Sequence, residues 1–133
     1  MKTLLPLAAT LSALSLGACA TFPNGPVVDG GPVRSDGQAM LGQPTRVGSL
    51  VATPQTLVED SRCPMNARCI WAGRVVVTTR IDGPGWRETA NLTLGQPYPT
   101  HGTTITLTSA RPDKMTGTTV PPRAYTFGFE GRR

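Results

Sequence analysis

Residues 69–94 read CIWAGRVVVTTRIDGPGWRETANLTL, and this stretch decides the fold. β-branched residues dominate its first half, which is typical of a strand, and a Gly- and Pro-rich turn signal follows at residues 82–86. Side chains on either side of this turn alternate between two faces. One face of the first half holds Val75, Val77, Thr79 and Ile81, and one face of the second half holds Ala90, Leu92 and Leu94. The stretch therefore predicts an antiparallel hairpin.

Four further segments have the same period of two. They are residues 46–52 and 55–59, which Pro54 separates, and residues 103–110 and 123–130. Turn-forming residues interrupt the chain every eight to twelve residues or so, and no stretch has a helical period with caps. We therefore expect an all-β domain, a small antiparallel β-sandwich that is Ig-like or barrel-like.

The first eighteen residues have the pattern of a secretory signal peptide, with Lys2, an apolar run at residues 4–16 and then small residues. The run is shorter than the about 20 residues that a membrane-spanning helix needs. Residues 16–19, Leu-Gly-Ala-Cys, resemble the lipobox of bacterial lipoproteins. This resemblance implies that Cys19 carries a lipid and begins the mature chain. Ordinary cleavage after Ala20 is the alternative.

Residues 19–41 are rich in Gly and Pro without apolar periodicity, so we expect a lipidated Cys19 followed by a tether. The β-sandwich domain is then residues 42–133. Ala20 rather than Asp follows the Cys, as in lipoproteins destined for the outer membrane. The resemblance thus implies attachment to the inner leaflet of the outer membrane, with the domain facing the periplasm.

The charge of the chain narrows the choice of partners. Thirteen Lys and Arg against eight Asp and Glu give a net charge of +5, and the cations are scattered along the sequence. Export argues against nucleic acid as a partner. We expect membrane attachment through the N-terminal lipid and, as a further partner, an envelope protein or polymer.

With Cys19 assigned to lipid, two of the three cysteines remain, and both lie in an exported domain. Disulfides persist in oxidising compartments, so Cys63 and Cys69 predict a structural disulfide. Closing so short a loop stabilises the fold by roughly 2–2.5 kcal/mol in the chain-entropy model. Pro64 stiffens the loop, and Asn66 tolerates turn conformations.

Two other interpretations of the cysteine loop stay open. In the first, two thiolates with Met65 between them would suit Cu(I). The cysteine spacing matches neither zinc ribbons nor thioredoxin-like motifs. We therefore expect no metal site and no other cofactor. A braced recognition loop would instead display its polar and apolar side chains to a partner, because preorganisation lowers the entropy cost of binding. The side chains concerned are Arg62, Met65, Asn66 and Arg68.

The residues that flank the loop predict a structural role. Asp60, Ser61 and Arg62 predict a turn in which Asp60 accepts hydrogen bonds from nearby amides and Arg62 pairs with a carboxylate. Trp71 lies two residues after Cys69, hence on the same face of the predicted strand, and we expect it to fill the core beneath the disulfide. Gly73 predicts a bulge or close packing. Trp86, in its turn, is the candidate for an exposed aromatic contact.

No pattern in the chain predicts catalysis. His101 is the single histidine, and the G-x-S-x-G nucleophile elbow is absent. The adjacent Glu59 and Asp60 would point to opposite faces of a strand, so they would not share a proton. We therefore expect a protein that is not an enzyme and has no catalytic residues.

The motif around the cysteines resembles one known family. Residues 60–64 read DSRCP and residues 69–73 read CIWAG, with Asp60, Ser61, Arg62, Cys63, Pro64, Cys69, Trp71, Ala72 and Gly73 all matching a D-S-R-C-P…C-x-W-A-G core. This core is similar to that of a family of small uncharacterised bacterial exported proteins and lipoproteins. The resemblance implies exported β-structure and no particular activity. The sequence thus predicts an envelope lipoprotein with a non-catalytic binding or structural domain.

Overall fold

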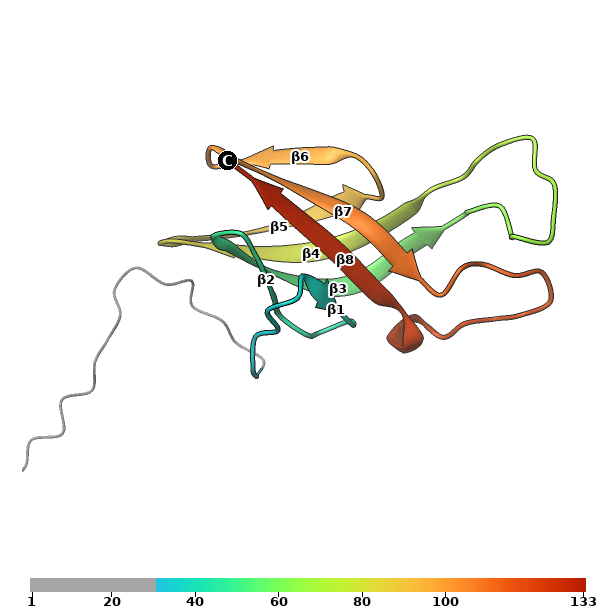
Figure 1. Ribbon diagram of the computed structural model, residues 1–133, viewed down its shortest axis with the longest axis horizontal. Coiled ribbons are helices and arrows are strands. Elements are labelled where there is room, and N and C mark those ends of the chain that lie inside the picture. The colour runs from blue at the N-terminus through green and yellow to red at the C-terminus, as the bar shows by residue number, and fades with distance from the viewer. Residues whose placement is uncertain (1–30) are drawn as a thin grey trace, which may run out of the picture.

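The structure, a computed structural model, describes residues 31–133 as two four-stranded antiparallel sheets packed face to face (Figure 1). The expected all-β sandwich is confirmed. The predicted signal peptide and Cys19 lie outside the described residues. The elements are β1 (Gln38–Ala39), β2 (Thr45–Val47), β3 (Leu50–Asp60), β4 (Val75–Gly83), β5 (Trp86–Thr93), β6 (Pro97–Thr100), β7 (Thr103–Arg111), the 3-10 turn η1 (Pro122–Ala124) and β8 (Thr126–Arg132).

The first sheet has the strand order β2-β3-β4-β5 and contains the predicted hairpin. β4 and β5 pair from Val76 with Thr93 to Gly83 with Trp86, so Pro84 and Gly85 form the turn. Gly83 leaves room for Trp86, because a Cβ at Gly83 would lie 2.2 Å from the indole ring. The hairpin confirms the turn that DGPGW predicts.

The second sheet has the order β1-β8-β7-β6. β7 and β8 form its centre, with Leu107 opposite Phe129 and Ala110 opposite Phe127. The alternating residues predicted to share a face point inward, as the full burial of Ile105, Leu107 and Phe127 indicates. The single core lies between the sheets and joins them through Val47, Leu50, Ala52, Val75, Val77, Ile81, Leu92, Ile105, Leu107, Ala110, Tyr125, Phe127 and Phe129.

Pro54 does not end a strand, which corrects one prediction. The chain turns earlier, at Gly48 with a φ of 61°, and β3 then runs through Pro54 to Asp60. β2 pairs only with residues 50–52, so at Pro54 the other edge of β3 has no strand beside it and needs no amide donor there. A register shift between Pro54 and Thr56 absorbs the proline.

Two other boundaries differ from the sequence prediction. The segment expected to be a loop before residue 103 contains β6, an edge strand in which Pro97 and Pro99 are tolerated because its outer edge needs no donors. The folded part also begins before residue 42, because β1 pairs with β8 and Ala39 is fully buried. Within residues 31–133, no helix is long and apolar enough to cross a membrane.

Candidate functional site

The disulfide loop, residues 61–74, connects β3 to β4 and protrudes from one end of the sandwich (Figure 1). Cys63 and Cys69 are bonded, which confirms the predicted disulfide, and their Cα atoms are 5.8 Å apart, within the usual range. A second connection, residues 112–121 between β7 and η1, lies beside it and is called the covering loop below.

Asp60 and Arg62 fix the entry to the disulfide loop. Arg62 Nε donates to Asp60 Oδ1 and Arg62 Nη2 to Asp60 Oδ2, both at 2.9 Å, and the Arg62 backbone N–H also donates to Oδ1 at 3.3 Å. Arg62 also donates to two carbonyl oxygens at the end of the other sheet, Ala110 O of β7 at 2.9 Å and Pro112 O at the start of the covering loop at 3.0 Å. The predicted turn is present, and the guanidinium ties it to the end of β7.

This network holds the Asp60 carboxylate in its charged form. The Arg62 hydrogen bonds lower the pKa of Asp60 from 3.8 to about 2; burial opposes this shift, and the Tyr125 hydroxyl, which donates to Oδ2 at 2.7 Å, adds to it. Burial raises the pKa of Tyr125, and its bond to Asp60 raises that pKa further. A carboxylate held so firmly ionised is a poor general acid or base near neutral pH.

We expect stability to fall as the pH is lowered from about 4 to about 2. The folded pKa of Asp60 lies below its unfolded value, so its contribution is complete above the unfolded pKa and is lost as the pH falls through the folded one. The loss should be about 1–2 kcal/mol after allowance for solvent screening. Urea titrations at a series of pH values measure it.

The same titrations on Asp60→Asn provide the control. Its stability should depend much less on pH in this window, although Glu59, whose pKa Arg74 lowers, titrates in the same direction. Equal pH dependence in both proteins would contradict the assignment to Asp60.

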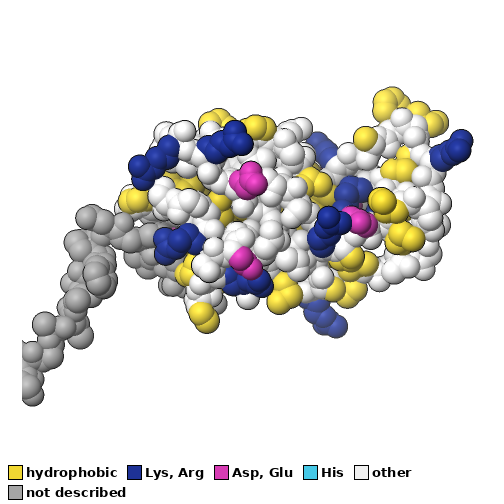
Figure 2. All heavy atoms as spheres, viewed as in Figure 1, with side chains coloured by type: hydrophobic (Ala, Val, Ile, Leu, Met, Phe, Trp, Pro, Cys, Tyr) yellow, Lys and Arg dark blue, Asp and Glu magenta, His cyan; other side chains and the backbone are white. Residues whose placement is uncertain are grey.

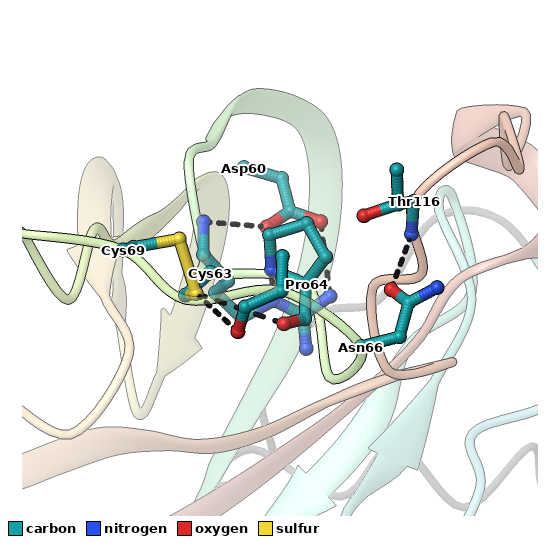
Figure 3. The surroundings of a disulfide bond; sticks show 8 residues. Asp60, Cys63, Pro64, Asn66, Cys69 and Thr116 are labelled. Carbon is teal, nitrogen blue, oxygen red and sulfur yellow. Dashed lines mark hydrogen bonds and ion pairs between the residues drawn. A yellow bond between two sulfur atoms is a disulfide. The ribbon is translucent and has the colours of Figure 1, made fainter.

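The covering loop holds the disulfide loop through backbone and side-chain bonds. Met65 N donates to Lys114 O at 2.8 Å, and Lys114 Nζ donates to Asp60 O at 2.8 Å. The Asn66 side chain points at the covering loop, where its Oδ1 accepts from Thr116 N at 2.8 Å (Figure 3). Asn66, predicted to be displayed to a partner, therefore fastens the two loops together.

The base of the disulfide loop is closed by a second set of contacts. Ser61 N donates to Arg74 O at 2.8 Å, Arg74 N donates to Ser61 Oγ at 2.9 Å, and Arg74 Nε pairs with Glu59 Oε2 at 2.7 Å. Gly73 makes this closure possible, because its φ is 67° and a Cβ there would lie 1.7 Å from Ser61 O. The predicted close packing at Gly73 is present.

Trp71 does not fill the core, which corrects the prediction. β4 begins only at Val75, so Cys69 and Trp71 lie in the loop rather than on one strand face. The ring is 82% exposed, and the adjacent Ile70 is 93% exposed. Tyr125, Phe127 and Val75 are among the buried residues of the core, and Trp71 is not.

Trp86 and His101 lie at the opposite end of the sandwich, in the β4–β5 and β6–β7 hairpins (Figure 1). Trp86 is half-buried, and its ring stacks on the His101 imidazole with centroids 3.8 Å apart. Trp86 is therefore not the exposed aromatic that its Gly-rich turn suggests. Since His101 is remote from Glu59 and Asp60, the three groups do not converge on one site.

A hollow of about 200 Å³ lies at the disulfide end of the sandwich, against the covering loop. It is lined by Asp60, Lys114, Met115, Thr118, Thr119, Val120 and Tyr125. Its charged groups are engaged, since Asp60 accepts from Arg62 and Lys114 donates to Asp60 O. Among residues 31–133, no three His, Cys, Asp or Glu side chains gather as metal ligands, and the disulfide occupies both thiols on which a Cu(I) site would depend.

Sequence reasoning missed the partners that come from the covering loop and from Tyr125, the residue before β8. Lys114 and Thr116 are some fifty residues from their partners, and no local pattern links them. Tyr125 offered a signal, because a tyrosine on a buried strand face needs a partner for its hydroxyl. Comparison of the chain with protein-family models, curated proteins and solved structures gives no match. The family resemblance of the cysteine motif therefore stays a prediction.

Proposed function

We propose that the chain is a non-catalytic binding domain of the bacterial cell envelope and that the tip of the disulfide loop, residues 65–72, is its binding surface. The observation that carries the proposal is the exposure of large apolar side chains at this tip. Ile70 and Trp71 are almost wholly exposed, and Met65 is 70% exposed. Exposed apolar side chains gathered in one place mark interaction sites in soluble domains.

The rigidity of the tip supports a binding role. The disulfide, the Asn66 bond to the covering loop and the closure at Gly73 restrain the loop before any partner arrives. Restraint in the free state lowers the ordering cost that binding would otherwise incur. A loop that only connected two strands would need neither these restraints nor an exposed tryptophan.

The rest of the domain favours binding over catalysis. Asp60 is held as a carboxylate by Arg62, and the His101 ring is stacked on Trp86 at the far end of the sandwich. Export and membrane attachment through Cys19 belong to this proposal, and they rest on the leader sequence alone.

Site-specific photocross-linking in intact cells tests the binding surface. A photoreactive amino acid at position 70 should form adducts in the envelope, because Ile70 is exposed and makes no contribution to the core. The matched control is position 89, where Thr89 is exposed on β5, away from the disulfide loop. Equal adduct yields at both positions, or none at position 70, would contradict the proposal.

A further inference from the structure

We propose that the tip of the disulfide loop inserts into the interfacial region of an anionic lipid bilayer, an inference that rests on the proposed binding role of the tip. Figure 2 shows hydrophobic side chains gathered at the loop end of the molecule, with a cationic side chain at their margin. Four large apolar residues are exposed in these two loops, namely Met65, Ile70 and Trp71 of the disulfide loop and Met115 of the covering loop.

The chemistry of these residues suits the boundary between water and hydrocarbon. Tryptophan is enriched at membrane interfaces, where its apolar ring and its N–H group are both accommodated. Ile70 and Met65 add aliphatic surface without any group that needs a hydrogen bond. Because loop backbone cannot enter the hydrocarbon with its polar groups unpaired, side chains alone should reach below the headgroups.

The positive charge of the disulfide loop favours anionic lipid headgroups. Residues 61–74 include three arginines and no aspartate or glutamate. Arg62 is engaged by Asp60 and Arg74 by Glu59, whereas Arg68 lies exposed beside Cys69 at the tip. A cation beside an apolar tip is attracted to anionic headgroups and can keep its charge at the level of the phosphates.

The size and shape of the tip favour a bilayer over a protein partner. A standard protein interface takes about 20–30 residues on each side and needs a complementary surface. The apolar tip is much smaller than this and projects from the end of the sandwich (Figure 1). A lipid surface imposes no such demand, because acyl chains and headgroups rearrange around a small apolar probe.

The two tryptophans of the chain allow a local test in the full-length protein. Trp86→Phe leaves Trp71 as the only indole, and Trp71→Phe leaves Trp86, which lies in the hairpin at the opposite end. Each oxidised protein is mixed with vesicles of phosphatidylglycerol and phosphatidylethanolamine whose acyl chains carry bromine, a short-range quencher. Trp71 emission should be quenched and shift to shorter wavelength, while Trp86 emission should not change. Quenching is local to the ring, so attachment of the chain through its N-terminus does not by itself produce it.

Two substitutions separate the apolar and charged contributions in the Trp71 protein. Ile70→Ser and Arg68→Glu should each raise the lipid concentration needed for half-maximal quenching by about tenfold. Both side chains are exposed, so the urea midpoint of each variant should equal that of its parent. Phosphatidylcholine vesicles should quench Trp71 much less than the anionic vesicles do.

The possible outcomes separate this inference from the proposed function. Unquenched Trp71, equal quenching of both tryptophans, or equal quenching in both lipids would each overturn insertion into an anionic bilayer. A wavelength shift that depends on protein concentration without vesicles would indicate a second copy of the chain instead. A protein adduct from position 70 together with unquenched Trp71 would support the proposed binding surface but contradict lipid as its partner. The absence of both adducts at position 70 and Trp71 quenching would contradict the binding surface and the lipid insertion alike.

Discussion

Asp60→Ala should destabilise the domain by about 3–4 kcal/mol, the largest loss we expect from any single change at the disulfide end. The Asp60 side chain is 7% exposed and accepts four hydrogen bonds, three from Arg62 and one from Tyr125. Its removal leaves the Arg62 guanidinium without a counter-charge and the Tyr125 hydroxyl without a partner. The penalty for these stranded groups exceeds the net contribution of the bonds themselves.

Urea unfolding of the purified, oxidised protein measures this loss as a lower midpoint with an unchanged slope. Asp113→Ala is a matched control, because Asp113 pairs with Arg111 across the same spacing of two residues but at an exposed position. It should cost less than about 1 kcal/mol. Similar losses from the two variants would show that burial of the Asp60 pair adds nothing.

The alternation of side chains was enough to predict which residues of the central strands β4 and β7 enter the core. Val75, Val77 and Ile81 on one sheet and Ile105 and Leu107 on the other are buried as their spacing indicates. The period of two carries this information because one face of each of these strands packs against the other sheet. The disulfide was also predictable, since the export that the leader sequence predicts would place two nearby cysteines in an oxidising compartment.

The orientation of Trp71 could not be predicted, because alternation assigns a face only where a strand exists. Gly73, with its positive φ, places the turn that separates Trp71 from the start of β4. The contacts of Lys114 and Thr116 depend on how two distant loops meet at one end of the sandwich. A sequence pattern reports local period and composition, and neither contains that geometry.

The residues of the cysteine motif fall into two groups, one that holds the loop in place and one that projects from it. Asp60, Arg62 and Gly73 hold the two ends of the disulfide loop against the sandwich. Lys114 of the covering loop and Tyr125, which precedes β8, bond to Asp60 and secure this arrangement. Ile70 and Trp71 take no part in this framework and project from it. The framework should therefore govern stability, and the projecting residues should govern binding.

Gly73→Ala should destabilise the domain by about 2–3 kcal/mol, because two penalties coincide at this position. The positive φ of 67° costs an alanine about 1–2 kcal/mol. The new Cβ would also lie 1.7 Å from Ser61 O, a backbone atom, so the closure between Ser61 and Arg74 must open or shift. The urea midpoint should fall accordingly.

Gly117→Ala measures the backbone penalty alone, so its comparison with Gly73→Ala isolates the steric penalty. Gly117 lies in the covering loop with a φ of 80°, and a Cβ there would meet no heavy atom within 4 Å. Its replacement should therefore cost only the backbone strain of about 1–2 kcal/mol, part of which the lower entropy of the unfolded chain offsets. If Gly73→Ala is no more destabilising than Gly117→Ala, the contact with Ser61 does not restrain the loop. The framework would then reduce to the disulfide, the Asp60–Arg62 pair and the bonds to the covering loop, and Ile70 and Trp71 would be held less firmly for binding.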